Sequence, residues 1–224
     1  MRTPVPRTFG YSLSGSLDVD QNGYPDLLVG SYEDATVILL RGRPIINIVT
    51  TVKGQLDGID PTRTQCDYDA SVKHTCFRFA ACFRLNSSLN LGVNLKLQYK
   101  IEAETFTGKK YYRVKFNSSA ELDRPNVVVK DTIIKSDTVR EEFCSEELVF
   151  LKDKSDIQNP VQFLLTYSLV QEVPPLTSTG GSVPDINRFP ILNQEEAQKI
   201  FEARFLKDCG EWLATPVPLM LRFS

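Results

Sequence analysis

An acidic loop with the sequence DVDQNGYPD, residues 18–26, offers the clearest chemistry in this chain. Its acidic and amide side chains alternate with other residues, and a single glycine inside the loop permits a sharp turn. Calcium in proteins takes about six to eight hard oxygen ligands from carboxylates, carboxamides and backbone carbonyls. We therefore predict a Ca²⁺ site in this loop. The predicted ligands are the side chains of Asp18, Asp20, Asn22 and Asp26 and the backbone carbonyl of Tyr24.

The spacing of these ligands matches the first part of an EF-hand calcium loop and then departs from it. Val29 stands where an EF-hand has a bidentate glutamate, and an EF-hand is flanked by helices. Here residues 10–15, 27–30 and 36–40 have the short alternating or apolar patterns of strands. The sequence therefore predicts a calcium loop between two strands of a hairpin. A solvated acidic turn without a metal is the alternative.

No constellation typical of an enzyme accompanies this loop. The chain has one histidine, His74, and contains neither a glycine-rich phosphate loop nor a G-x-S-x-G nucleophile motif. Asp67 and Asp69 could imitate a pair of catalytic carboxylates, but their setting is more typical of a hydrophilic loop. We therefore predict that the chain is not an enzyme.

Cysteines and glycosylation sequons indicate the cellular compartment. No two cysteines have the C-x-x-C spacing of a zinc ribbon. Two disulfides with one cysteine left over, or five free thiols, fit the spacing equally well. Asn86 and Asn117 begin N-x-S sequons, so each is a candidate N-glycan acceptor if the chain is secreted. The five cysteines are Cys66, Cys76, Cys82, Cys144 and Cys209.

The composition limits the remaining classes of function. Hydrophobic residues make up 42% of the 224 residues, which is enough for a sizeable core, and the formal net charge of −2 argues against a nucleic-acid partner. No apolar stretch reaches the roughly 18 residues of a membrane span. Residues 1–10 lack the apolar segment of a signal peptide. An intracellular protein is then the default expectation, but the cysteines and the sequons argue against it.

Most of the chain has the period-2 pattern of strands with one buried face. Residues 93–102 alternate apolar and polar side chains throughout, and residues 161–169 repeat that pattern. Turn-forming residues separate about seven such segments, which predicts an all-β fold of the immunoglobulin-like β-sandwich type. The other predicted strands lie at residues 44–49, 113–116, 127–129 and 148–151.

Two segments depart from this pattern, and a domain boundary is also expected. Residues 193–206, NQEEAQKIFEARFL, have the composition of a helix with Asn193 as its N-cap. Residues 173–184 have the composition of a loop. A domain boundary is expected at Arg43–Pro44, where a new apolar strand begins.

Two sets of motifs follow one another along the chain. Residues 9–48 read FGYSLSGSLDVDQNGYPDLLVGSYEDATVILLRGRPIINI, in which Phe9–Gly10, the acidic loop, Val29–Gly30 and Arg43–Pro44 are distinctive. Together with the downstream segments, these motifs resemble the integrin α subunit, where the last FG-GAP repeat of its β-propeller continues into its thigh domain. The matching downstream segments are residues 75–83, 144–148, 190–193 and 205–210.

The resemblance implies a division into three parts. Residues 1–43 would be the C-terminal fragment of a propeller, residues 44–210 an immunoglobulin-like thigh domain, and residues 211–224 an atypical tail. It also implies a glycoprotein on the extracellular side of the plasma membrane. The parent receptor would act in cell adhesion with an integrin β subunit and a ligand from the extracellular matrix or a cell surface.

The resemblance further implies how the cysteines pair. The family pattern joins Cys66 to Cys76 and Cys82 to Cys144 and leaves Cys209 without its usual partner. It also implies that residues 193–205 are largely extended, against their helix propensity. Because the other propeller blades are absent, we expect weak calcium binding and fraying of residues 1–43. A free-standing extracellular calcium-binding β-sandwich is the alternative hypothesis.

Overall fold

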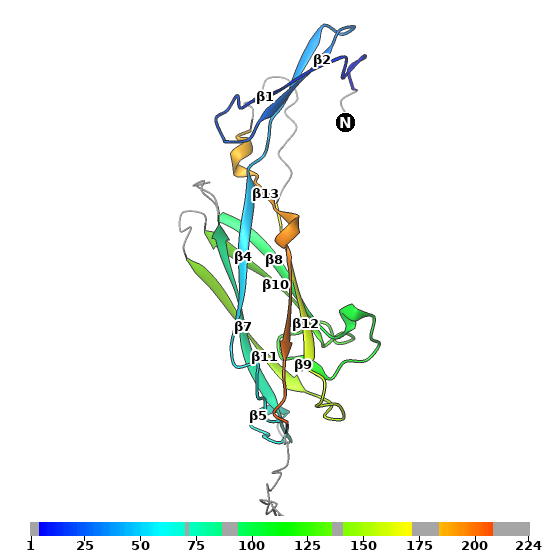
Figure 1. Cartoon of the computed structure of the whole chain (residues 1–224), viewed down its shortest axis with the longest axis vertical. Helices are drawn as coiled ribbons and strands as arrows, with labels where there is room; N and C mark the ends of the chain where they lie inside the picture. The colour runs from blue at the N-terminus through cyan, green and yellow to red at the C-terminus, as the bar shows by residue number, and fades with distance from the viewer. Residues whose placement is uncertain (1–4, 70–71, 87–93, 136–140, 172–183, 208–224) are drawn as a thin grey trace, which may run out of the picture.

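The computed structural model shows an elongated, almost entirely β protein (Figure 1). A three-stranded sheet lies at one end of the molecule, and a two-layered sandwich forms the rest. Within the described ranges the only helices are single 3₁₀ turns, and none of them is long and apolar enough to cross a membrane. The structure describes residues 5–69, 72–86, 94–135, 141–171 and 184–207.

One layer of the sandwich is a five-stranded sheet with the order β13-β4-β7-β11-β9. Its neighbours are antiparallel, except that β13 pairs parallel with β4. A hairpin of β5 and β6 lies at the far end of the molecule from β2 (Figure 1). The bounds are β4 Ile45–Lys53, β5 Cys66–Asp69, β6 Val72–His74, β7 Cys76–Asn86, β9 Val114–Phe116, β11 Glu142–Leu151 and β13 Ile191–Leu192.

The second layer is an antiparallel four-stranded sheet with the order β10-β8-β12-β14. In β8 the apolar side chains of Leu95, Leu97, Tyr99 and Ile101 are buried, whereas the polar residues at 94, 96 and 98 are exposed. The predicted alternation is therefore confirmed. The bounds are β8 Asn94–Ala103, β10 Val127–Lys135, β12 Val161–Leu169 and β14 Gln198–Ala203.

The core lies between these two sheets and is rich in aromatic rings. Phe79 of β7 and Phe163 of β12 meet edge to face with their ring centroids 5.5 Å apart. Phe83 and Tyr99 lie 5.0 Å apart farther along the same interface. Aromatic pairs add packing energy beyond their buried area, so this interface holds the layers together. The prediction of an immunoglobulin-like β-sandwich is confirmed.

The helix predicted for residues 193–206 from composition is wrong. Asn193 does cap a turn, since its side chain accepts a hydrogen bond from the Glu195 N–H, but this turn is the short 3₁₀ helix η3, Gln194–Glu196. The chain then continues as β14 and pairs with β12. Pairing with a buried strand outweighs helix propensity here. The extended course implied by the family resemblance is therefore confirmed.

Other expectations concern residues outside the described part of the structure. These are residues 173–183 of the predicted loop, Cys209 and the tail 211–224.

Candidate cation-binding loop

The acidic loop connects the first two strands of the three-stranded sheet. β1, Ser12–Leu17, pairs antiparallel with β2, Asp26–Ser31, which pairs in turn with β3, Thr36–Leu40. The loop thus lies in a β-hairpin, as predicted. Gly23 has a φ of 87°, a left-handed conformation that favours glycine, and it allows the chain to turn back toward β2.

Three carboxylates converge inside this loop. Asp18, Asp20 and Asp26 each place one carboxylate oxygen within 4.8 Å of the others. Asp18 accepts hydrogen bonds from the backbone N–H groups of Asn22 and Gly23, at 3.1 and 2.7 Å. These bonds fold the loop around Asp18, so the backbone itself holds the carboxylates together.

Asp20 differs from the other two acids because both of its carboxylate oxygens are buried without a hydrogen-bond partner. Burial raises the pKa of its carboxyl group above the ordinary value, and the negative charges of Asp26 and Asp18 add to that rise. A largely buried carboxylate that accepts no hydrogen bond and lies beside two like charges is costly. Hard oxygen donors in this arrangement fit a divalent cation, which would neutralise that charge.

The side chains of the remaining predicted ligand residues form hydrogen bonds with backbone groups. The Asn22 carboxamide oxygen accepts a hydrogen bond from the Tyr24 N–H at 2.8 Å, and its nitrogen donates to the Gly42 carbonyl at 2.9 Å. The Tyr24 hydroxyl donates to the Ile45 carbonyl at 2.9 Å. The structure thus brings the carboxylates of Asp18, Asp20 and Asp26 together, and the ligand roles of all five residues remain predictions.

The linker between β3 and β4, residues 41–44, contacts the acidic loop from outside. The sequence did not predict this contact. The Gly42 N–H donates to the Asp26 carboxylate at 2.7 Å. A Cβ atom on Gly42 would lie 2.9 Å from the Pro25 carbonyl oxygen, so only glycine lets the linker approach this closely. Arg41 places a guanidinium nitrogen 3.8 Å from Asp20. The only sequence signal for this contact was the glycine between two arginines, and its composition indicated no more than a linker.

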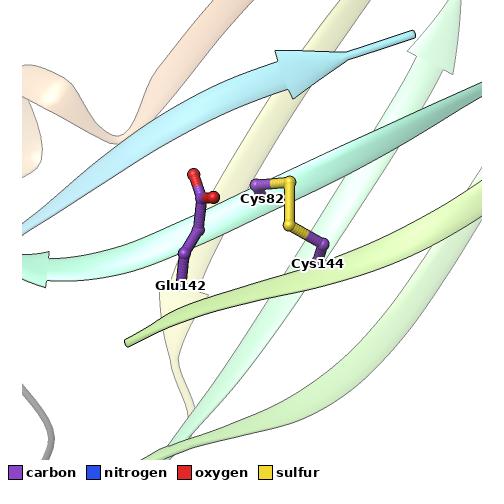
Figure 2. A group of neighbouring side chains, drawn as sticks. All are labelled: Cys82, Glu142 and Cys144. Atoms are coloured by element: carbon purple, nitrogen blue, oxygen red, sulfur yellow. A yellow bond between two sulfur atoms is a disulfide. The ribbon is translucent and has the colours of Figure 1, made fainter. Parts of the chain in front are cut away.

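A second group of candidate metal ligands, Cys82, Glu142 and Cys144, is not a metal site. Cys82 and Cys144 lie directly opposite each other on β7 and β11 and form a disulfide, so neither offers a thiolate (Figure 2). Glu142 lies beside them and accepts hydrogen bonds from Thr51 and Lys53. The disulfide joins β7 to β11, and the hydrogen bonds of Glu142 join β11 to β4.

The other cysteine pair is also joined. A disulfide connects Cys66 of β5 to Cys76 at the start of β7. Both pairings agree with the pattern implied by the family resemblance. The hairpin that the bond fastens contains His74, whose ring meets Phe150 edge-on at 6.4 Å between centroids. Asp67 is exposed on the same hairpin, opposite Lys73.

Both predicted glycosylation sites lie on the surface. Asn86 is exposed at the end of β7, and Asn117 is exposed just after β9. The Asn117 backbone N–H donates to the Leu148 carbonyl at 2.9 Å, so the backbone is held while the side chain remains accessible.

Comparison with known proteins agrees with this architecture. The family model described as integrin alpha Ig-like domain 1 matches residues 42–208. The chain belongs to the integrin alpha family. A second model, the FG-GAP repeat, matches residues 9–39, which contain the acidic loop, β1, β2 and all but the last residue of β3. The two matches follow one another in order, so the hypothesis of a free-standing sandwich is not favoured.

Curated integrin alpha chains resemble most of this chain. Integrin alpha-V of Gallus gallus is 30% identical over 211 residues, which cover 92% of this chain and 19% of that protein. Integrin alpha-3 of Mus musculus is 32% identical over 213 residues, or 92% of this chain and 18% of that protein. Integrin alpha-6 of Homo sapiens is 29% identical over 210 residues. The chain thus spans less than a fifth of the length of these relatives.

Proposed function

We propose that this chain is the segment of an integrin α chain that joins the propeller to the thigh domain, with a mechanical role in an adhesion receptor. The observation that carries the proposal is the acidic loop of an FG-GAP repeat hydrogen-bonded to the linker that continues as the first strand of the sandwich. Integrin alpha chains are adhesion receptors rather than enzymes. Support and alignment of neighbouring domains need no reactive group.

The proposed domain division follows the sequence. Residues 1–43 are the end of a propeller, residues 44–210 are the thigh sandwich, and residues 211–224 are a tail. The two family matches, which meet near Arg43, support the first boundary. In this proposal the parent receptor lies on the extracellular side of the plasma membrane, pairs with an integrin β subunit and binds a matrix or cell-surface ligand.

The cation of the proposal is Ca²⁺. FG-GAP repeats of integrin alpha homologues bind divalent cations. The side chains of Asp18, Asp20, Asn22 and Asp26 and the Tyr24 carbonyl would hold the ion, and the ion would neutralise the negative charge of the clustered carboxylates.

A calcium titration of the secreted chain, followed by the amide resonances of Gly23 and Gly42, tests the cation site. Both N–H groups donate to the clustered carboxylates, so calcium binding should shift their resonances. The matched control is Asp34→Asn, which removes an exposed acid of the same sheet that lies outside the cluster. The control should titrate like the wild type, and Asp18→Asn should not titrate. A wild-type chain whose Gly23 and Gly42 resonances stay fixed in calcium would refute the site.

A peptide map of the chain secreted from eukaryotic cells tests the compartment. We expect glycans on Asn86 and Asn117 and the bonds Cys66–Cys76 and Cys82–Cys144 under non-reducing conditions. A chain retained in the cytosol with free thiols would contradict the extracellular assignment.

A further inference from the structure

Arg41 is the positive charge that faces the acidic loop. Its guanidinium nitrogen Nη1 lies 3.8 Å from Asp20 Oδ2, and both side chains are about four-fifths buried, with 22% and 19% of their surface exposed. Among the described residues, no other lysine or arginine forms an ion pair with Asp18, Asp20 or Asp26. Arg41 is therefore the counter-ion of the loop in the cation-free state.

The sandwich holds this guanidinium in place. Its second nitrogen donates to the Pro184 carbonyl at 2.5 Å, and Pro184 lies just before the turn η2, Ile186–Arg188. An arginine keeps its proton throughout the physiological pH range. A fixed charge tied to the sandwich thus lies beside the one carboxylate of the loop that has no hydrogen-bond donor.

We propose that Arg41 sets the cation affinity of the loop, because a divalent cation must displace its guanidinium from Asp20. This inference rests on the proposed cation site and adds a residue that is not a ligand. The guanidinium and the cation compete for the same carboxylate, and their like charges repel at short range. By linkage, a bound cation weakens the hold of Arg41 on Asp20 by the same factor. The sandwich, by retaining Arg41 beside the loop, therefore keeps calcium binding weak.

Arg43 provides a matched control two residues farther along the same linker. Its guanidinium donates to the carbonyls of Phe189 and Pro190 and forms no ion pair with the loop. Arg43→Gln and Arg41→Gln remove the same charge from the same linker, and each removes hydrogen bonding to the sandwich, one bond for Arg41 and several for Arg43. Only Arg41→Gln removes the partner of Asp20.

The test is calorimetric titration of the whole chain with Ca²⁺, for the wild type, Arg41→Gln, Arg41→Lys and Arg43→Gln. We expect Arg41→Gln to bind calcium about tenfold more tightly, since one nearby positive charge is removed. Arg41→Lys retains the charge and should stay within about threefold of the wild type. Arg43→Gln should change the affinity by less than about twofold. Urea unfolding in EDTA shows whether each variant is folded.

The outcomes separate this inference from the proposed function. If the wild type and both Arg41 variants bind calcium equally, or if Arg41→Gln binds more weakly, the inference is wrong while the cation site stands. If Arg43→Gln gains as much affinity as Arg41→Gln, general electrostatics explains the effect and the inference is wrong. If the folded wild type and the folded Arg41→Gln variant both fail to bind calcium, the cation site itself is refuted.

Discussion

At the scale of single residues, the buried carboxylate of Asp20 destabilises the cation-free loop, in a site that calcium is proposed to fill. Its oxygens are buried without donors, and the charge of Asp26 acts with burial to raise the pKa of its carboxyl group. Asp18 and Asp26 differ, because backbone N–H groups satisfy them. The loop is therefore folded without a cation, and Asp20 is its least stable member.

We predict opposite effects of Asp20→Asn with and without calcium. In EDTA the variant should be more stable than the wild type by on the order of 0.5 kcal/mol, because the loss of burial cost and of repulsion by Asp26 and Asp18 outweighs the loss of the long 3.8 Å ion pair with Arg41. In calcium it should bind at least about tenfold more weakly, because the site loses a charged ligand. Urea unfolding in each buffer measures both effects, with Asp34→Asn as the control. Loss of stability in EDTA would show that Asp20 supports the fold instead.

Arg113 has a purely structural role. It pairs with Glu104 at 2.6 Å, with only 5% and 3% of the two side chains exposed, and it also donates to the carbonyls of Asn159 and Pro160. Removing one partner of a buried ion pair leaves the other charge unpaired, which costs about 3–5 kcal/mol.

We therefore predict that Arg113→Leu lowers the free energy of unfolding by about 3–5 kcal/mol. Arg204→Leu is the control, since Arg204 is 66% exposed and its ion pairs lie on the surface. The control should change stability by less than about 0.5 kcal/mol. Equal urea midpoints for the two variants would contradict the structural role assigned to Arg113.

At the scale of elements, the two disulfides fasten different parts of the sandwich. Cys82–Cys144 joins the central strands β7 and β11 and closes a separation of 62 residues. Cys66–Cys76 ties the β5–β6 hairpin to β7 across a separation of 10 residues. On the chain-entropy account, the longer loop gives the larger stabilisation.

We predict that replacing Cys82 and Cys144 together by alanine destabilises the sandwich by about 4 kcal/mol, and replacing Cys66 and Cys76 together by about 3 kcal/mol. Thermal unfolding of the two double variants, each against the wild type, gives the comparison. A larger loss for the hairpin bond would mean that packing of the hairpin outweighs chain entropy.

The strands could be predicted from the sequence, but the course of the last strand could not. Strands such as β8 have one face in the core, so their apolar and polar side chains alternate along the sequence. The segment that ends in β14 contains good helix formers, and only its pairing with β12 makes part of it a strand. Gln162 and Glu202, for example, are paired although they lie 40 positions apart in the sequence. No local sequence pattern reveals such a pairing.

The acidic loop was predictable for a similar reason, and its surroundings were not. Ligand types and their spacing are local, so Asp18, Asp20 and Asp26 were identified and the structure brings them together. Gly42 and Arg41 approach the loop from beyond β3, and their roles depend on how the hairpin folds. A local pattern thus contains the proposed ligands of the site, but it does not contain the residues beyond β3 that contact the loop.

At the scale of the whole molecule, the sandwich and the three-stranded sheet differ in how much apolar surface they bury. The sandwich has a buried hydrophobic core between two layers, whereas the three-stranded sheet is a single layer with exposed apolar side chains. Leu13, Leu17 and Val37 are 66%, 65% and 70% exposed. A single small sheet without a second layer is marginally stable. The hydrogen bonds between the acidic loop and the linker therefore carry much of its attachment to the sandwich.

Hydrogen exchange should display this inequality directly. We predict that amides of β1, β2 and β3 exchange much faster than those of β7 and β8, because local opening of the small sheet breaks few buried contacts. Saturating calcium should slow exchange in the loop and at Gly42 and leave β7 and β8 unchanged, since a ligand stabilises only the unit whose folded form it binds. Exchange measured by NMR on the secreted chain, with magnesium-free EDTA buffer as the reference, gives these rates. If the small sheet were as protected as β7 in EDTA, it would be an independently stable unit, and the linker contacts would not be what maintains it.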